Sequence, residues 1–233
     1  MKITKLIRKP LNLAGIDIKK YRPAVDPLKW LEKYDIKTII DIGAHTGQFA
    51  KEIREKLPQV KIYSFEPLKD CYQKLVQNMS MDKNFKAYNF ALGNKESRQE
   101  INRSASSPSS SLLPMANLHE EMYPHTKGGS KEEIDVKRLD DVFKDSDLEK
   151  EILVKIDVQG YEDKVIEGGI NIISQAKIAL LEVSFLELYK GQALFSEIYD
   201  IMKRLGFRYQ GRTQQRINPL TGEVLYEDSI FIR

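Results

Sequence analysis

The sequence predicts a doubly wound α/β fold, a mostly parallel sheet with helices on both faces that ends in an antiparallel hairpin. Short runs of β-branched and apolar residues alternate with stretches whose apolar residues recur every three or four positions, which is typical of strands followed by helices. Two of these runs end in an aspartate and lead through glycine into a helical pattern, at Asp41 and at Asp157. The last two runs are joined by a turn that contains Pro219 and Gly222, which predicts the hairpin.

Each element follows from its local pattern. Thr38–Ile42 is nearly all apolar, as expected for a strand that is covered on both faces. The apolar stripe of Phe49, Ile53 and Leu57 predicts the next helix. Further strands are expected at 60–65, 85–92, 152–157, 177–183, 207–209 and 224–232, with helices over 68–79, 160–173 and 194–205. Residues 98–103 are a candidate edge strand, 134–136 a short strand and 139–143 a short helix.

The chain divides into a basic N-terminal appendage, residues 1–30, and one α/β domain, residues 31–233. The appendage is rich in Lys and Arg with apolar residues between them, and two interpretations stay open. It contacts an anionic membrane surface or a partner, or it is a solvated lead-in that packs on the domain. Within the domain, residues 104–130 have no clear period. Because loops of that length are usually functional or disordered, we expect a lid over the site.

Composition limits the function. The 233 residues carry a formal net charge of only +3, so the charge does not indicate nucleic acid as a partner. The single cysteine, Cys71, excludes an internal disulfide and is typical of a reducing cytoplasm. No apolar run approaches the roughly 18 residues of a spanning helix, and the N-terminus lacks the pattern of a secretory signal. We therefore expect a cytoplasmic protein.

The turn between the first strand and its helix predicts a cofactor. Its pattern, Asp41 followed by Gly43 and Gly47, differs from the three close glycines of a dinucleotide fingerprint. A carboxylate at the end of the strand would repel a pyrophosphate, whereas it suits the positive centre of S-adenosylmethionine. We expect Asp41 near the methionine portion, with the glycines allowing close approach of the backbone. Glu66, at the end of the second strand, is placed to accept hydrogen bonds from the ribose, and Pro67 fixes its turn.

Acids at the ends of later strands predict where a methyl acceptor binds. Asp157 ends the strand expected beside the first one, and ligands bind where the strand order reverses. Its candidate roles are general base, hydrogen-bond acceptor or ligand of a divalent cation, with a helix cap as the structural alternative. Glu162, one turn into the next helix, could share that site. Glu182 lies in an apolar strand, where it either contacts the site or pairs with Lys155.

The three histidines have no metal-ligand spacing, so no metal site is predicted. His119 and His125 fall in the 104–130 stretch, where either one could bind the acceptor or act as a base, or be an ordinary surface residue. We include His119 with Asp157 and Glu162 among the candidate catalytic residues. His45 lies inside the first turn and is expected to be held by its neighbours.

Five motifs in one order resemble the FkbM-type methyltransferases, a branch of the class I S-adenosylmethionine-dependent enzymes. They are Asp41-Ile-Gly-Ala-His-Thr-Gly47, Phe65-Glu-Pro67, Ala91-Leu-Gly93, Lys155-Ile-Asp-Val-Gln-Gly-Tyr-Glu162 and Leu181-Glu-Val-Ser184. The resemblance covers about residues 37–210. Two positions depart from it: the family often has Asn where this chain has His45, and Glu where it has Gln159. The second departure leaves one carboxylate fewer for a metal.

The resemblance implies a seven-stranded sheet and O-methylation of a hydroxyl, often on a sugar or a polyketide-type product. By it Asp41, Gly43, Ala44 and Gly47 line the donor site, Glu66 holds the ribose, and Asn89 and Ala91 lie near the adenine; Phe49 and Pro67 complete the predicted cofactor-binding set. Asp157 and Glu162 would face the acceptor. Bacterial members commonly accompany polysaccharide biosynthesis, so a glycan or another small molecule is the expected acceptor.

Two other functions stay open at this stage. A nicotinamide-dependent oxidoreductase could use a similar sheet, although Asp41 and the missing third glycine disfavour it. A non-catalytic binding module could keep the same fold. The sequence names neither the acceptor nor the oligomeric state.

Overall fold

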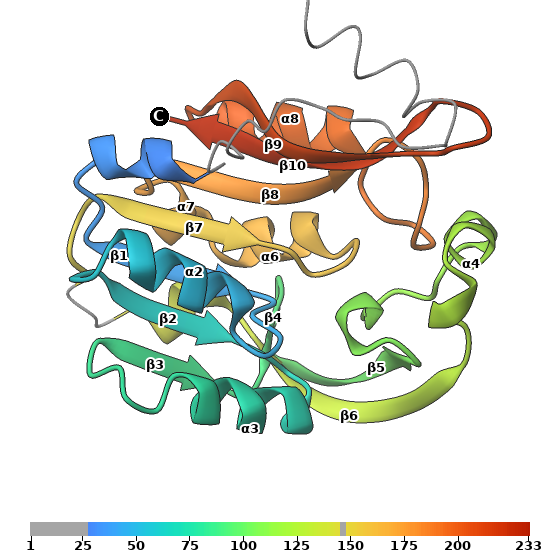
Figure 1. The fold of residues 1–233 in the computed structure, drawn as a ribbon, viewed down its shortest axis with the longest axis horizontal. Helices are drawn as coiled ribbons and strands as arrows, with labels where there is room; N and C mark the ends of the chain where they lie inside the picture. The colour runs from blue at the N-terminus through green and yellow to red at the C-terminus, as the bar shows by residue number, and fades with distance from the viewer. Residues whose placement is uncertain (1–27, 145–147) are drawn as a thin grey trace, which may run out of the picture.

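A strand buried along its whole length, β1 (Thr38–Ile42), lies in the middle of the main sheet. The structure is a computed structural model that describes residues 28–144 and 148–233. In these ranges the main sheet also contains β2 (Lys61–Phe65), β3 (Phe85–Tyr88), β7 (Ile152–Ile156), β8 (Ile178–Ser184), β9 (Arg208–Ile217) and β10 (Val224–Ile232). The seven strands have the order β3-β2-β1-β7-β8-β10-β9 (Figure 1). The chain order reverses between β1 and β7, and β10 runs antiparallel to both of its neighbours.

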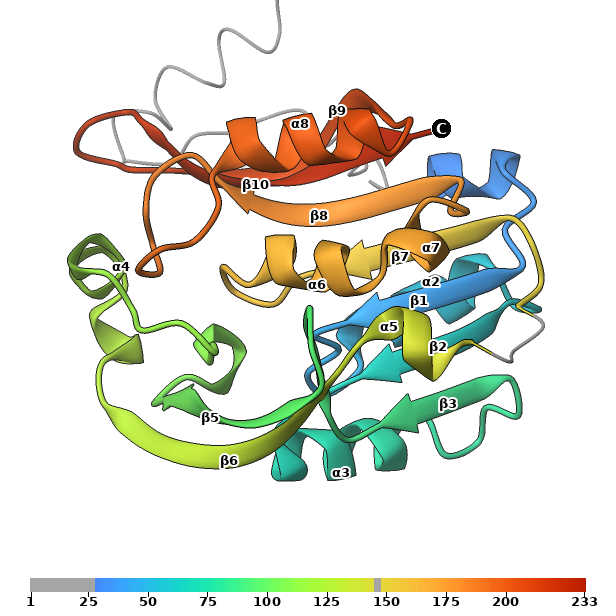
Figure 2. The same ribbon diagram turned by 180° about the vertical axis from the view of Figure 1, so that it is seen from behind.

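Helices cover both faces of this sheet (Figures 1 and 2). One layer holds η1 (Lys29–Lys33), α2 (Gln48–Lys56) and α3 (Lys69–Asn78), and the other holds α5 (Leu139–Val142), α6 (Glu162–Gly168), α7 (Ile170–Ile173) and α8 (Phe195–Arg204). Ile39 packs in the first layer, and its neighbour Ile40 packs in the second. Because successive side chains point to opposite faces, a strand with two covered faces must be continuously apolar. The predicted doubly wound fold and its antiparallel C-terminal strands are confirmed.

The third predicted strand, 85–92, is wrong as one element. The chain leaves the main sheet after Tyr88, and β4 (Ala91–Leu92) pairs with a different sheet. Asn89 lies in the bend, and its side-chain amide donates hydrogen bonds to the carbonyl oxygens of Glu66 and Pro67 at 3.0 and 2.8 Å. These bonds hold the bend against the end of β2, so the interruption positions residues beside the site.

A second sheet lies on both sides of the predicted irregular stretch 104–130. β5 (Ser97–Ser104) pairs antiparallel with β6 (Gly129–Lys137), and β4 pairs parallel with β6. The expected strands 98–103 and 134–136 are therefore parts of one long ribbon, which curves away from the main sheet in Figure 1. Between its strands lie η2 (Ser107–Ser109), α4 (Asn117–Met122) and η3 (Pro124–Thr126). We call residues 105–128 the cap segment.

Charged pairs accompany a small apolar cluster in the ribbon, in which Ile101, Ile134 and Val136 are buried. Lys131 donates to Glu100 across the strands at 2.9 Å. Arg103 donates to Glu132 within the ribbon and to Asp70 of α3. Exposed pairs contribute little each, but the Arg103 pair with Asp70 fixes the ribbon to the main domain and so sets the place of the cap segment.

Other elements differ from the prediction in extent. The helix expected over 160–173 is divided into α6 and α7 around Gly169, and β9 is longer than the predicted 207–209. Most of the basic appendage 1–30 lies outside the described residues, so its predicted membrane contact is untested; Leu28 is buried on the η1 face. No helix of residues 28–144 or 148–233 is both long and apolar enough to cross a membrane.

A close backbone contact gives a test of this packing. A Cβ atom on Gly168 would lie 1.9 Å from the carbonyl oxygen of Gly93, so α6 must move away from β4 if the residue is larger. We expect Gly168→Ala to lower the free energy of unfolding by roughly 1–3 kcal/mol, although alanine favours helix by about 1 kcal/mol. Urea denaturation measures the free energy of unfolding of this variant, and Lys164→Ala on the same helix is the control. Unchanged stability of Gly168→Ala would contradict the packing.

Candidate functional site

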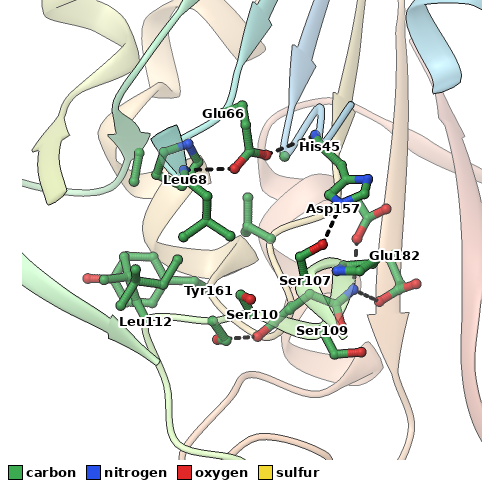
Figure 3. A pocket seen from close by; sticks show the side chains of 18 of the residues that line it. His45, Glu66, Leu68, Ser107, Ser109, Ser110, Leu112, Asp157, Tyr161 and Glu182 are labelled. Atoms are coloured by element: carbon green, nitrogen blue, oxygen red, sulfur yellow. Dashed lines mark hydrogen bonds between the residues drawn. The ribbon is translucent and has the colours of Figure 1, made fainter. Parts of the chain in front are cut away.

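A cavity of about 440 Å³ lies at the carboxyl ends of β1, β2, β7 and β8, with the cap segment on its far side (Figure 3). This volume is typical of small-molecule sites. Of the predicted site residues, Gly43, Glu66, Pro67, Ala91, His119 and Asp157 line the cavity. Asp41, Ala44, Gly47, Phe49, Asn89 and Glu162 do not line it. The first group comes from five separate parts of the chain, and the fold brings them together.

The glycines of the first turn serve packing within the protein. Gly43 has a φ of +81°, and a Cβ on it would lie 1.8 Å from the carbonyl oxygen of Asp157. Gly47 has a φ of +90°, and a Cβ there would lie 2.8 Å from Leu75. The expectation that both glycines open the backbone to a ligand is therefore wrong for Gly47, whose surroundings belong to α2 and α3. At Gly43 the missing Cβ lets the loop after β7 lie directly against the turn.

Beneath the cavity, a buried lysine joins the ends of β1 and β7. The ammonium of Lys155 lies 3.1 Å from Asp157 Oδ2 and 3.9 Å from Asp41 Oδ1. Burial lowers the pKa of Lys155, but the charges of Asp157 and Asp41 outweigh burial and raise it, so the ammonium stays charged. The face of Phe49 covers this ammonium, with 5.6 Å from Nζ to the ring centre.

Asp41 therefore has a structural environment. Its side chain is fully buried, and its Oδ2 accepts a hydrogen bond of 3.1 Å from Ser64 on β2. A direct contact with the methionine portion of a cofactor does not fit this placement. Asp41 instead acts through Lys155 on the acid that does line the cavity, Asp157. Ala44 is buried as well, and its N–H donates to the carbonyl oxygen of Phe65.

Glu66 lies at the end of β2 with its carboxylate in the cavity wall. Its Oε2 accepts from the N–H of His45, and its Oε1 accepts from the N–H of Leu68, both at 2.8 Å. Burial raises the pKa of Glu66 to about 7, although these two N–H groups act in the opposite direction. Each oxygen keeps a lone pair for a ligand hydroxyl, so Glu66 has the chemistry predicted for a ribose anchor.

One wall of the cavity is apolar. Figure 3 shows Leu68, Leu112 and Tyr161 together on the side away from Asp157 and Glu182. Other members of this wall are Phe90, Ala91 and Ile101. An apolar, partly aromatic surface next to Glu66 suits a flat base attached to a ribose. The bend at Asn89 presents Phe90 and Ala91 to the cavity, so Asn89 acts on the site through the backbone.

The opposite wall carries two acids joined by an amide. Asp157 follows β7, and its side chain is 32% exposed. The Nε2 of Gln159 donates to Asp157 Oδ1 at 2.9 Å and to Glu182 Oε1 at 2.6 Å. The predicted Lys155–Glu182 pair is wrong, because Lys155 binds the aspartates and Glu182 faces the cavity. Arg216 of β9 and Tyr226 of β10 complete this wall.

Glu162 does not face the acceptor region. Its side chain is buried, and Oε1 accepts from the N–H groups of Val158 and Gly160 at 3.0 and 3.1 Å. Burial raises the pKa of Glu162 to about 7 against the effect of these N–H groups. Glu162 thus shapes the loop that carries Asp157, and the catalytic role predicted for it does not fit this position.

The histidines have different surroundings. His119, expected on a surface loop or as a base, is buried, with Nε2 3.2 Å from the hydroxyl of Tyr189 and Nδ1 3.3 Å from that of Thr126. Burial lowers its pKa, so the ring is neutral at pH 7. His45 is held by its neighbours, as predicted: Nε2 lies 2.9 Å from Ser107 Oγ, and Nδ1 lies 3.2 Å from Gln48. His125 is exposed at the cavity rim.

Several cavity residues had no signal in the sequence. Arg216 belongs to β9, whose extent was underestimated, and Tyr226 lies in the predicted strand 224–232 without a signal for the cavity. Their assignment needs the pairing of β10 with β8, which is a long-range contact. Tyr189, in an irregular connection before α8, does not line the cavity but contacts the cavity residue Gln159. In the sequence, Gln159 stood out only because it departs from the motif that the chain resembles there. Four serines of the cap segment also line the cavity: Ser107, Ser109, Ser110 and Ser111.

The fold and the cavity together define an enzyme-type site for an adenosine-containing cofactor at the point where the strand order reverses. The chain matches the methyltransferase FkbM domain over residues 41–209. It belongs to this family and is a methyltransferase whose cofactor is S-adenosylmethionine. Of the two enzyme classes that the sequence left open, the family assignment favours the methyltransferase over the oxidoreductase.

Two relatives by sequence are methyltransferases as well. The chain is 27% identical to the 2-O-methyltransferase NoeI of Sinorhizobium fredii, over 84% of this chain and 80% of NoeI. It is also 27% identical to the methyltransferase sdnD of Sordaria araneosa, over 72% of this chain and 73% of sdnD. Among solved structures, it resembles an S-adenosylmethionine-dependent methyltransferase from Aquifex aeolicus at 13% identity, with a TM-score of 0.42 over 98% and 96% of the two chains.

The lining of the cavity fits this cofactor. Of the Lys and Arg side chains that the structure describes, Arg216 alone lines the cavity, and it belongs to the wall with Glu182. A pyrophosphate would therefore find no cationic cradle next to Glu66. Glu66 would hold the ribose and the apolar wall the adenine. Among residues 28–144 and 148–233, no three His, Cys, Asp or Glu side chains are grouped to hold a metal ion.

The pKa of Glu66 predicts how cofactor affinity depends on pH. With a pKa of about 7 in the free protein, Glu66 is mostly ionised at pH 8 and mostly protonated at pH 6. Ribose hydroxyls donate to the ionised form, so binding selects it, and the affinity falls as the pH falls. We expect the Kd of S-adenosylhomocysteine to rise roughly tenfold between pH 8 and pH 6. Isothermal titration calorimetry measures this Kd. The Glu66→Gln variant should bind S-adenosylhomocysteine more weakly than the wild type, with a Kd that does not change with pH. A flat profile for the wild type would exclude Glu66 as the anchor.

Proposed function

We propose that the protein transfers the methyl group to a hydroxyl of a sugar, a glycan or another polar small molecule. The observation that carries this proposal is the placement of the Asp157 carboxylate, part-exposed in the cavity across from Glu66. The serines of the cap segment and the acids and amides of the opposite wall offer hydrogen bonds to a hydroxyl-rich acceptor. The 2-O-methyltransferase activity in the name of NoeI agrees with this reaction.

The mechanism follows from the two walls. The bound cofactor supplies an electrophilic methyl group on a sulfonium. Glu66 and the apolar wall fix the donor, while Asp157 orients the acceptor hydroxyl, so that the two reactants meet in line. With the cofactor bound, its sulfonium would supply the methyl group for the acceptor oxygen, and Asp157 would take the proton that this hydroxyl gives up. The Lys155 ammonium lies 3.1 Å from Oδ2 of Asp157 and holds this carboxyl group in place.

Three further expectations, on location, nucleic acid and membrane contact, remain proposals. A cytoplasmic location, the absence of a nucleic-acid partner and an approach of the basic appendage to a membrane all agree with a glycan or glycolipid acceptor. A non-catalytic binding module with the same fold differs from this proposal in one respect, since it would bind the cofactor without transferring the methyl group.

The identity of the acceptor can be tested directly. The purified protein is incubated with methyl-labelled S-adenosylmethionine and fractions of cell extract, and the labelled product is identified by mass spectrometry. We expect a methyl ether on a hydroxyl-rich compound. Label on nitrogen or sulfur would contradict the proposal, and cofactor binding without transfer to any fraction would favour the binding module.

Substitution of Asp157 tests its role. We expect Asp157→Asn to lower methyl transfer by about 10²–10⁴, the usual contribution of a general base, because the amide cannot take the proton. The Kd of S-adenosylhomocysteine should change by no more than about threefold, since Glu66 and the apolar wall are untouched. Asp200→Asn, at an exposed position of α8, is the matched control. Full activity of Asp157→Asn would remove this residue from catalysis.

A further inference from the structure

Gln159 lies at the centre of the acceptor-facing wall, and every polar atom of its side chain has a partner. Its Nε2 donates to both acids, Asp157 and Glu182, and its Oε1 accepts from the hydroxyl of Tyr189 at 2.7 Å. Its backbone carbonyl accepts from Ser111 of the cap segment at 2.6 Å. The two amide hydrogens thus bridge the carboxylates of β7 and β8, which would otherwise repel each other.

The neighbours fix the orientation of this amide. Carboxylate oxygens accept hydrogen bonds, so the NH₂ group must face Asp157 and Glu182, and the amide oxygen must face Tyr189. The Tyr189 hydroxyl then donates to that oxygen, and the Nε2–H of His119 donates to the tyrosine oxygen at 3.2 Å. His119 therefore supports Tyr189, which supports Gln159.

The backbone holds Gln159 in this place. Its φ is +57°, a left-handed conformation that costs a residue with a side chain about 1 kcal/mol. Such strain persists only where the surroundings enforce it. Here Glu162 accepts from the N–H groups on either side, those of Val158 and Gly160. The loop thus aims the Gln159 side chain between the two acids.

The same residues connect the wall to the cap segment. The Tyr189 hydroxyl lies 3.1 Å from the carbonyl oxygen of Ser109, and Tyr189 forms a β-bridge with Met115. With the bond from Ser111 to Gln159, three contacts seat the cap segment on this wall. The position of the amide is therefore tied to the position of the segment that covers the cavity.

Charges from the neighbouring strands also face this pair. Lys155 lies beside Asp157, Asp228 of β10 lies across from Glu182 in the pairing of β10 with β8, and Arg216 comes from β9. Burial raises the pKa of Glu182 well above its usual range, and the charge of Asp157 raises it further. The two acids therefore lie in unlike surroundings, since the Lys155 ammonium lies beside Asp157 and an acid, Asp228, lies opposite Glu182.

We propose that Gln159 is the positioning residue of the methyl-acceptor site. It holds Asp157 and Glu182 at a fixed separation for one hydroxyl. Tyr189 and His119 orient Gln159 in turn. This proposal rests on the proposed function, since it assigns Asp157 to the acceptor. It gives a function to a departure from the family pattern. A glutamate at this position would offer no hydrogen at neutral pH and would add a third carboxylate, whereas the amide bridges the two acids without a cation.

Carboxyl titration by NMR tests the positioning without any acceptor. Protein labelled with ¹³C at the Asp and Glu carboxyl carbons is titrated, and the signals are assigned with Asp157→Asn and Glu182→Gln. Gln159→Met keeps the length of the side chain and removes both donors. We expect the titration midpoint of Glu182 to rise by about one pH unit, because the hydrogen bond to its ionised form is lost. Tyr189→Phe should move this midpoint in the same direction by less, and Gln175→Met, on the exposed surface, should not move it.

Methyl transfer supplies the second readout. We expect Gln159→Met to lower the transfer rate at least tenfold, a rough figure for a misplaced reactant, with the Kd of S-adenosylhomocysteine unchanged. For Gln159→Glu, the rate relative to wild type should rise as the pH falls from 8 to 6, because a protonated glutamic acid can donate one hydrogen bond. For Gln159→Met, the rate relative to wild type should stay constant over the same pH range.

The outcomes separate the two proposals. If the Glu182 titration midpoint is unchanged in Gln159→Met, while circular dichroism shows that the protein is folded, the positioning role is overturned whatever the acceptor is. A shifted Glu182 midpoint, with a wild type that methylates no hydroxyl, would leave the positioning of the acids intact and refute the proposed reaction. Equal losses of rate in Gln159→Met and Gln159→Glu at every pH would reduce Gln159 to a purely structural residue and also overturn the proposal.

Discussion

The site depends on one ion pair network, in which the Lys155 ammonium lies between the buried Asp41 of β1 and the partly exposed Asp157 after β7. These two strands are neighbours at the point where the strand order reverses, and Asp41 pairs in register with Lys155. A charge as buried as that of Asp41 is costly without a partner, and Lys155 is the cation beside it. The network therefore joins the two halves of the sheet and places the Asp157 carboxyl group at the cavity. Asp41, predicted as a cofactor contact, acts on the chemistry through this lysine.

Two loops fit against each other above that network, and each is shaped by a carboxylate that accepts backbone N–H groups. Glu66 accepts from His45 and Leu68, and Glu162 accepts from Val158 and Gly160. Burial raises the pKa of both to about 7, yet their roles differ, because only Glu66 of these two lines the cavity. The same kind of carboxylate therefore serves two purposes. Glu66 is open to a ligand in the cavity, whereas Glu162 only holds its own loop. The difference is decided by which side of the loop faces the cavity.

The sequence predicted the parts of the molecule that local pattern determines. β1 and β7 have continuous apolar runs, and the acids after β2 and β7 lie where the strands end, so the main sheet, Glu66 and Asp157 could be placed. The β5–β6 ribbon was predicted only in pieces, because few of its residues are apolar: Ile101, Ile134 and Val136 are buried, while most of the others carry charged or polar side chains such as Lys131 and Glu100. Long-range contacts also decided the roles of Gly47 and Glu162. Nothing in their own segments shows that Leu75 fills the space beside one, or that backbone N–H groups surround the other.

The two departures from the family pattern share a physical setting. His45 and Gln159 both adopt left-handed backbone conformations, with φ of +49° and +57°, and each follows the end of a central strand. Each also contacts the cap segment: His45 binds Ser107 on the cofactor side, and the Gln159 carbonyl binds Ser111 on the acceptor side. An asparagine at the first position tolerates this conformation but is too short to replace the imidazole contact. The two departures therefore lie at contacts between the cap segment and the loops that follow the central strands. The cap also reaches both walls of the cavity, because Leu112 belongs to the apolar wall and Ser111 binds the loop that carries Gln159.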